Sequence, residues 1–155
     1  MEVVARATLH APHDLVWRTL TDYDRLSAFI PGMLKSRVVE KRGPTAIIEQ
    51  FGEVRFLIFS FPIEVTVESV EKPPDVIEVR ALKGTLKRLD GGYRIEHSVL
   101  PGVLVLHWRG MIEPATPLPP LLGEVILRAS IEAQFAGIVR EIERRQSAGT
   151  AKEGR

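Results

Sequence analysis

The sequence predicts an α+β fold in which a curved antiparallel sheet of about seven strands packs against a long C-terminal helix. Most of the first 115 residues alternate apolar and polar side chains with the period of two that is typical of strands. Turn residues such as Arg42-Gly43-Pro44 separate these segments, which favours an antiparallel meander. The last third has an unbroken helical pattern from about Leu121 to Arg145. With no second helix of similar length to pack on, this helix must lie against the sheet.

The chain begins with a strand and two short helices. Val3 to Leu9 alternates apolar and polar residues, and Pro12 then stands where a helix can begin, because its missing N–H costs nothing in a first turn. The helix from His13 to Leu20 places its apolar residues near one face, and a second short helix is predicted from Tyr23 to Phe29. Ile30-Pro31-Gly32 ends it.

Six strands follow, and their alternation indicates which side chains point inward. They are predicted at Met33–Lys41, Thr45–Val54, Phe56–Val70, Val76–Leu82, Gly84–His97 and Val103–Glu113. In the last strand one face is predicted to hold Leu104, Leu106, Trp108, Gly110 and Ile112, and the other His107 and Arg109. Because each strand has one polar face, we expect one face of the sheet to be exposed to solvent.

The long helix carries two apolar stripes. One consists of large side chains, at Leu127, Ile131, Phe135, Ile138 and Ile142. The nearly opposite stripe ends in small ones and comprises Leu122, Val125, Ile126, Ala129, Ala133 and Ala136. An ordinary surface helix shows a single stripe. Whichever stripe faces the sheet, the other needs a covering, a ligand or a partner, and the stripes alone do not decide between them.

Composition excludes several classes of function. The chain has 155 residues, a formal net charge of +1 and no cysteine. The balanced charge gives no electrostatic footprint for DNA or other nucleic acid, and the lack of cysteine excludes disulfides, thiolate nucleophiles and Cys-ligated zinc. No segment has the length and apolarity of a signal peptide or a membrane span, so we expect a cytoplasmic protein without stable membrane insertion.

Few residues in the sequence have the pattern of a catalytic, metal-binding or phosphate-binding site. The four histidines, His10, His13, His97 and His107, show no spacing of metal ligands. No serine lies in a nucleophile motif, and no glycine run forms a phosphate loop. We therefore predict no metal, no cofactor and no catalytic residue.

Three segments carry a family resemblance. They are Ala11–Met33, with its Thr21-Asp22-Tyr23 and Ile30-Pro31-Gly32 runs, Gly84–Ile95, and Ile112–Leu122. Together with the order of elements, they resemble the helix-grip fold of the START-like, or SRPBCC, superfamily and its polyketide cyclase/dehydrase and coenzyme Q-binding branch. Asp90-Gly91 alone favours a hairpin turn, whereas the resemblance implies one continuous strand with a bulge at Gly91-Gly92.

The resemblance implies one START-like domain over residues 1–145. The small and polar residues at 146–155 predict a disordered tail. It also implies a cavity between sheet and helix that binds a hydrophobic small molecule, such as a lipid, an isoprenoid quinone or a polyketide-like aromatic, for a carrier or sensor. The predicted ligand-binding residues are Phe29, Met33, Ser36, Gln50, Phe51, Phe59, Tyr93, Trp108, Leu122, Ile126, Ala129 and Ala133.

Two alternatives remain open. A polyketide cyclase or dehydratase needs little more than a shaped apolar pocket and one or two positioned polar groups. The second helix stripe, or the apolar residues Phe56, Ile58 and Val76, could instead be covered by a twin chain in a homodimer or by a ribosomal partner.

Overall fold

Seven strands form one antiparallel sheet in the computed structural model, which describes residues 1–115 and 122–153, apart from the side chains of Phe56 and of residues 151–153. In chain order the elements are β1 (Glu2–Leu9), α1 (His13–Leu20), η1 (Tyr23–Arg25), α2 (Leu26–Phe29), β2 (Met33–Arg42), β3 (Thr45–Phe56), β4 (Phe59–Lys72), β5 (Val76–Gly84), β6 (Leu86–His97), β7 (Leu104–Pro114) and α3 (Leu122–Glu153). The strands lie side by side in the order β1-β7-β6-β5-β4-β3-β2, so the predicted meander is confirmed and β1 is added beside the last strand.

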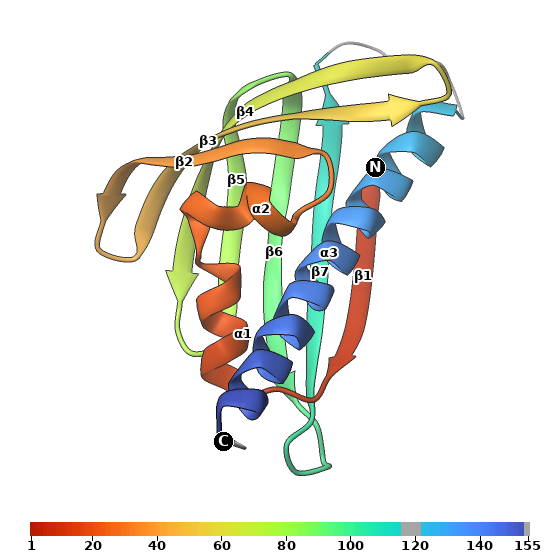
Figure 1. The fold of residues 1–155 in the computed structure, drawn as a ribbon. Helices are drawn as coiled ribbons and strands as arrows, with labels where there is room; N and C mark the ends of the chain where they lie inside the picture. Colours follow the sequence, from red (N-terminus) through yellow and green to blue (C-terminus); the bar gives the residue numbers. More distant parts are fainter. Residues whose placement is uncertain (116–121, 154–155) are drawn as a thin grey trace.

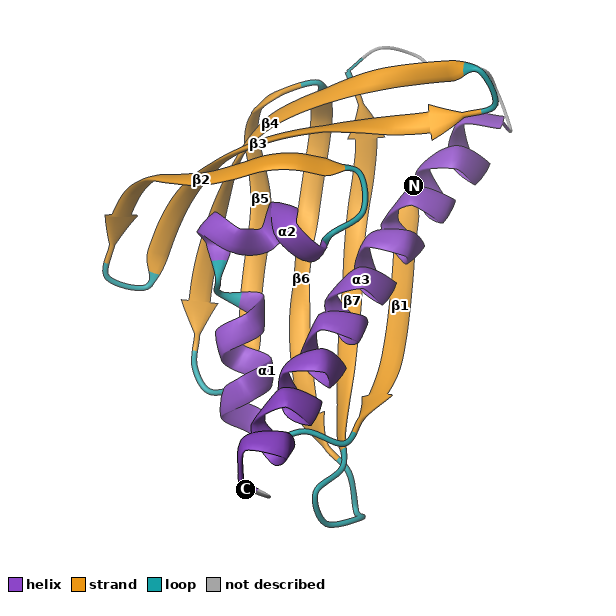
Figure 2. Ribbon diagram, in the orientation of Figure 1, coloured by secondary structure: helices purple, strands orange, loops and turns teal. Residues whose placement is uncertain are grey.

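The sheet is strongly curved, and all the helices lie on its concave side. Figure 1 shows β2, β3 and β4 bending across one end of the other strands, while α3 crosses diagonally in front of them. The same view by secondary structure places α1 and α2 beside α3 on this face (Figure 2). The fold is the predicted helix-grip arrangement.

The strand phases agree with the predicted inward faces. In β6, Ile95 is 2% exposed whereas its neighbours Arg94 and Glu96 are exposed. In β7 the inward residues Leu104, Leu106, Trp108, Gly110 and Ile112 are all buried. The same core includes Ile48 of β3, Val67 of β4 and Ile77 of β5.

One local prediction was right about the strand and wrong about the irregularity. β6 continues through Gly91-Gly92, which pair in regular register with Gly110 and Arg109 of β7. The register shift lies between Leu86 and Arg88. The glycines instead serve close packing, because a Cβ on Gly91 would lie 2.6 Å from the Cα of Gly110.

The helix α3 turns its stripe of large residues to the sheet. Leu127, Phe135, Ile138 and Ile142 are 9%, 8%, 3% and 0% exposed. The helix continues to Glu153, past the end predicted at Arg145 and through residues 146–153 of the predicted disordered tail. No proline interrupts it there. Leu121, where the helix was predicted to begin, lies in the segment 116–121, outside the described residues.

None of the helices in the described ranges is long and apolar enough to cross a membrane.

Candidate functional site

A cavity of ≈ 200 Å³ lies between the concave face of the sheet and α3. Most of its wall is aliphatic or aromatic. The strands β3 to β7 contribute the floor, the short helices and the start of β2 contribute one side, and α3 contributes Leu127, Ser130, Ile131, Gln134, Phe135 and Ile138. An enclosed apolar space with a few polar groups is the usual form of a small-molecule site.

Two aromatic residues with polar atoms lie next to each other on the cavity floor. Tyr93 of β6 pairs directly with Trp108 of β7, and their ring centroids are 4.9 Å apart at 53°. Gly110 makes room for the indole, because a Cβ there would lie 2.8 Å from the Trp108 ring.

Neither aromatic has its polar atom satisfied by the part of the chain that the structure describes. The indole nitrogen of Trp108 is buried without a hydrogen-bond partner. Burial is the cause that raises the pKa of Tyr93, and no hydrogen bond contributes, so its hydroxyl is a neutral donor at physiological pH. Buried donors without partners such as the Trp108 indole N–H are uncommon in folded proteins, and Trp108 and Tyr93 both line the cavity.

A second polar pair lies at the side of the cavity and is satisfied internally. The hydroxyl groups of Tyr23 and Ser69 are 3.0 Å apart, and the Ser36 hydroxyl donates to the Tyr23 carbonyl oxygen at 2.6 Å. Burial raises the pKa of Tyr23 to about 12, which the bond from Ser69 only partly offsets. This pair fixes the short helices to β2 and β4 and leaves less capacity for a ligand than Tyr93 does.

The roof of the cavity is also partly polar. Ser130 and Gln134 stand one turn apart on α3 and are joined by a long hydrogen bond of 3.4 Å from the Gln134 amide. Gln50 of β3 faces the same space. The cavity therefore offers amide and hydroxyl groups near its roof and two donors on its floor.

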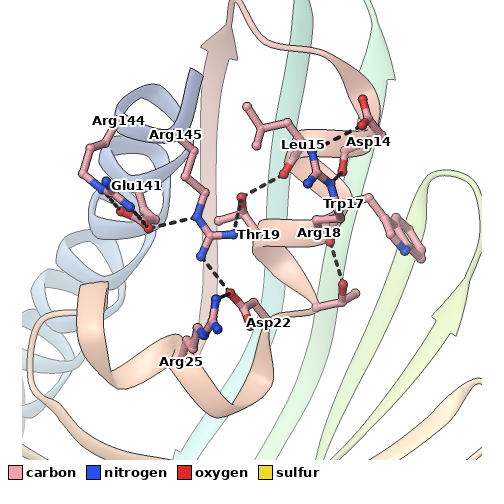
Figure 3. Close-up of polar contacts among 11 residues, drawn as sticks. Asp14, Leu15, Trp17, Arg18, Thr19, Asp22, Arg25, Glu141, Arg144 and Arg145 are labelled. Atoms are coloured by element: carbon pink, nitrogen blue, oxygen red, sulfur yellow. Dashed lines mark hydrogen bonds and ion pairs between the residues drawn. The ribbon is translucent and has the colours of Figure 1, made fainter. Parts of the chain in front are cut away.

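An ionic network fixes the C-terminal half of α3 to the first helices (Figure 3). The Arg145 guanidinium donates to the Asp22 carboxylate at 2.8 Å, to the Glu141 carboxylate at 2.9 Å and to the Thr19 hydroxyl at 3.4 Å. It also lies 5.5 Å from the Phe29 ring centroid. Since Arg145 is only 20% exposed, this network connects three elements at one place.

The charges of this network stabilise one another. Hydrogen bonds from Arg144 and Arg145 hold the pKa of Glu141 below its usual range, against the opposing effect of burial. Burial alone would lower the pKa of Arg145, but its bonds to Asp22 and Glu141 raise it. Both groups therefore stay charged across the physiological range.

The structure brings together some of the predicted ligand residues. Those that line the cavity are Met33, Gln50, Phe51, Tyr93 and Trp108. Their role in binding a ligand stays a prediction.

The other predicted positions lie elsewhere. Phe29 is half-buried beneath Arg145, Ser36 is bonded to the Tyr23 carbonyl, and Phe59 is 57% exposed on the β3–β4 hairpin. On α3, the predicted wall of Leu122, Ile126, Ala129 and Ala133 is wrong, because none of these residues lines the cavity and all but the half-buried Ile126 are exposed. The large-residue stripe buries more apolar area and takes the inward face instead.

The sequence analysis missed five polar residues that line the cavity, namely Tyr23, Glu53, Ser69, Ser130 and Gln134. Ser69 continues the inward phase of Val65 and Val67 in β4, which a strict count of alternation would have revealed. Ser130 and Gln134 flank the large stripe of α3, so they could be assigned only after the inward face of the helix was known.

The curved sheet, the long helix and the cavity between them define a protein of the START-like class. The family model described as polyketide cyclase / dehydrase and lipid transport matches residues 9–143, and the chain belongs to this family. No curated protein matches the sequence significantly.

Solved structures of low sequence identity share the fold. A protein from Thermus thermophilus is 14% identical with a TM-score of 0.81, covering 94% of this chain and 99% of its own. The Zhui aromatase/cyclase from Streptomyces is 22% identical with a TM-score of 0.74, covering 94% of both chains. A STAR-related lipid transfer protein from Xanthomonas axonopodis is 13% identical with a TM-score of 0.74, covering 92% of this chain and 85% of its own.

Proposed function

We propose that the protein binds a hydrophobic small molecule with an oxygen acceptor in this cavity, as a carrier or sensor. The observation that carries the proposal is the pair of unbonded donors, the Tyr93 hydroxyl and the Trp108 indole N–H, on the floor of an apolar cavity. A carbonyl, ether or hydroxyl oxygen of a ligand would accept from them, and the aliphatic wall would bury the rest.

The size of the cavity restricts the ligand. At ≈ 200 Å³ it lies below the roughly 300–1,000 Å³ of pockets for drug-sized molecules. A compact, ring-sized group fits this volume, which favours a quinone head or one aromatic ring of a polyketide over a complete diacyl lipid. Burial of the ring would supply roughly 25 cal/mol per Å² of apolar surface removed from water.

Native mass spectrometry of the purified protein tests the proposal directly. We expect a co-purifying apolar species that is lost after denaturation and organic extraction. A protein that is empty and also takes up no quinone or aromatic polyketide on titration would contradict it.

A matched pair of substitutions on α3 locates the site. Ser130→Trp places an indole in the cavity and should abolish ligand uptake. Ala133→Trp places the same group on the exposed side of the helix and should leave uptake unchanged. Equal effects of the two substitutions would remove the space under α3 from the site.

Catalysis in the same cavity is the second candidate. It is favoured by the neutral, buried Tyr93 hydroxyl, which can donate to a carbonyl during cyclisation or dehydration, and by the likeness of the fold to an aromatase/cyclase. Incubation with a poly-β-ketone substrate discriminates the two functions. A dehydratase returns a product lighter by one water, whereas a carrier returns its ligand unchanged.

Association is the third hypothesis, and it rests on the second stripe of α3. Leu122 and Val125 are 42% and 62% exposed, so a twin chain or a ribosomal partner would have an apolar face to cover. An oligomer that persists at high salt on size-exclusion chromatography would favour this hypothesis, and a monomer would oppose a homodimer.

A further inference from the structure

Two histidines and an aspartate from three separate segments meet at one end of the sheet. His13 begins α1, Asp75 lies in the turn between β4 and β5, and His97 ends β6. One ligand atom from each lies within 4.8 Å of the other two. These residues are far apart in the sequence, which is why histidine spacing predicted no metal site.

The two imidazoles face the same carboxylate oxygen. The Nε2 atoms of His13 and His97 lie 2.9 Å and 3.8 Å from Oδ1 of Asp75. The rings are stacked with centroids 5.6 Å apart and planes within 3°. The shorter of the two distances is a hydrogen bond, whereas the longer is too long for one. Hydrogen bonding to Asp75 therefore accounts for the position of His13 but not for that of His97.

Coordination of one ion would account for the approach of both imidazoles to the Asp75 carboxylate, with a rotation of the His97 side chain to complete the site. Zinc bonds of about 2.0–2.1 Å in a tetrahedron place neighbouring ligand atoms about 3.3 Å apart, and the two distances to Asp75 lie on either side of this value. We propose that His13, Asp75 and His97 bind a divalent transition-metal ion of the zinc type, with the fourth position left to solvent. Imidazole nitrogens select such ions over Mg²⁺ and Ca²⁺, which prefer oxygen ligands.

Neighbouring contacts hold two of the ligands in place. The backbone carbonyl of Asp75 accepts from the Ile95 amide at 2.8 Å, and the His13 ring stacks on Trp17 at 6.5 Å. The His97 side chain is 65% exposed, so it can rotate to complete the coordination. None of the three ligands lines the cavity. The ion would thus join α1, the β4–β5 turn and β6 and stabilise the fold without touching a cavity ligand.

The test is a calorimetric titration of Zn²⁺ into chelator-treated protein that carries no histidine tag, with thermal unfolding recorded alongside. We expect one Zn²⁺ per chain, a raised melting temperature with Zn²⁺ and no such rise with the same concentration of Mg²⁺. His97→Ala should lower the Zn²⁺ affinity at least tenfold, and because its side chain is exposed, this substitution should leave the fold intact.

His107→Ala is the matched control, since His107 also faces a carboxylate, Glu96 at 2.7 Å, but has no second histidine beside it among the described residues. This variant should bind Zn²⁺ as the unchanged protein does. The proposal is overturned if the unchanged protein takes up no stoichiometric Zn²⁺, if uptake persists in the double variant His13→Ala/His97→Ala, or if Mg²⁺ stabilises the protein equally.

Discussion

Removing the hydroxyl of Tyr93 should weaken ligand binding without weakening the fold. Tyr93 and Tyr23 both line the cavity, but of the two only the Tyr23 hydroxyl has a partner in the described part of the chain, at 3.0 Å on Ser69. The substitutions Tyr93→Phe and Tyr23→Phe therefore delete the same atom from two environments. The first removes a donor that is available to a ligand, and the second breaks a bond within the protein.

We expect Tyr93→Phe to affect ligand affinity and Tyr23→Phe to affect the free energy of unfolding. Tyr93→Phe should cost a ligand one hydrogen bond, about 1 kcal/mol or about fivefold in Kd, while the free energy of unfolding stays the same or rises. Tyr23→Phe leaves Ser69, which is 1% exposed, without its partner. A buried polar group left unsatisfied costs about 1–3 kcal/mol, and each 1 kcal/mol lowers the melting temperature of a domain of this size by about 2–4 °C.

Alkaline unfolding provides an independent check on Tyr23. Its pKa is raised from the ordinary value of 10.0 to about 12, so the folded state holds the phenol proton more tightly than the unfolded state does. The resulting stability is fully present below pH 10 and is lost as the pH rises through about 12. Urea unfolding at a series of pH values above 10 should show a shallower loss in Tyr23→Phe than in the unchanged protein.

Binding is measured by quenching of tryptophan fluorescence with a short-chain isoprenoid quinone, and a saturated isoprenoid hydrocarbon serves as the ligand without oxygen. Tyr93→Phe should weaken the binding of the quinone and leave that of the hydrocarbon unaffected. The reasoning is refuted if Tyr93→Phe lowers the melting temperature as much as Tyr23→Phe does, or if it leaves quinone affinity unchanged.

The remaining predictions concern how α3 is held. Arg145→Ala should lower the free energy of unfolding by about 2 kcal/mol, because it removes charged hydrogen bonds of a side chain that is 20% exposed. Arg144→Ala, at an exposed position, should leave the melting temperature unchanged. Equal losses of stability in the two variants would refute a special role for Arg145. Gly137→Ala should destabilise by about 1–3 kcal/mol, since its Cβ would clash with Cδ of Pro31. Gly149→Ala, with no atom within 4 Å, should stabilise the helix by up to about 1 kcal/mol; urea unfolding of both variants checks the contrast.

The fold was predicted well from the sequence because the alternation of apolar and polar residues within each strand indicates its inward face. Alternation around Ile95 and in β7 required no knowledge of distant residues, and short turns made the meander unambiguous. The family resemblance added the order of elements and the cavity. The position of the bulge in β6 was missed because the glycine pair Gly91-Gly92 is explained by close packing on the neighbouring strands, with Gly91 against Gly110 of β7 and Gly92 against Ile77 of β5.

The site was predicted less well because it depends on which stripe of α3 faces the sheet. Both stripes are apolar, so local pattern could not rank them, and the choice of Ala129 and Ala133 followed from the idea that small residues leave volume. In the structure the cavity lies beside other residues of α3. The large residues Phe135 and Ile138 are buried and border the cavity, together with Ser130 and Gln134 beside the stripe.

In α3 the inward residues beyond Phe135 are more deeply buried than Ser130 and Ile131, and we expect substitutions in the two regions to affect stability and binding differently. Beyond Phe135 the inward residues are nearly inaccessible, down to 0% exposed at Ile142, and Arg145 joins this half to the first helices. Towards the N-terminus of α3, Ser130 and Ile131 are only half-buried and line the cavity. The ionic network of Arg145 therefore lies beyond the part of α3 where Ser130 and Ile131 border the cavity. Because Arg145 does not line the cavity, substitutions at Arg145 should act on unfolding and substitutions at Ser130 on uptake.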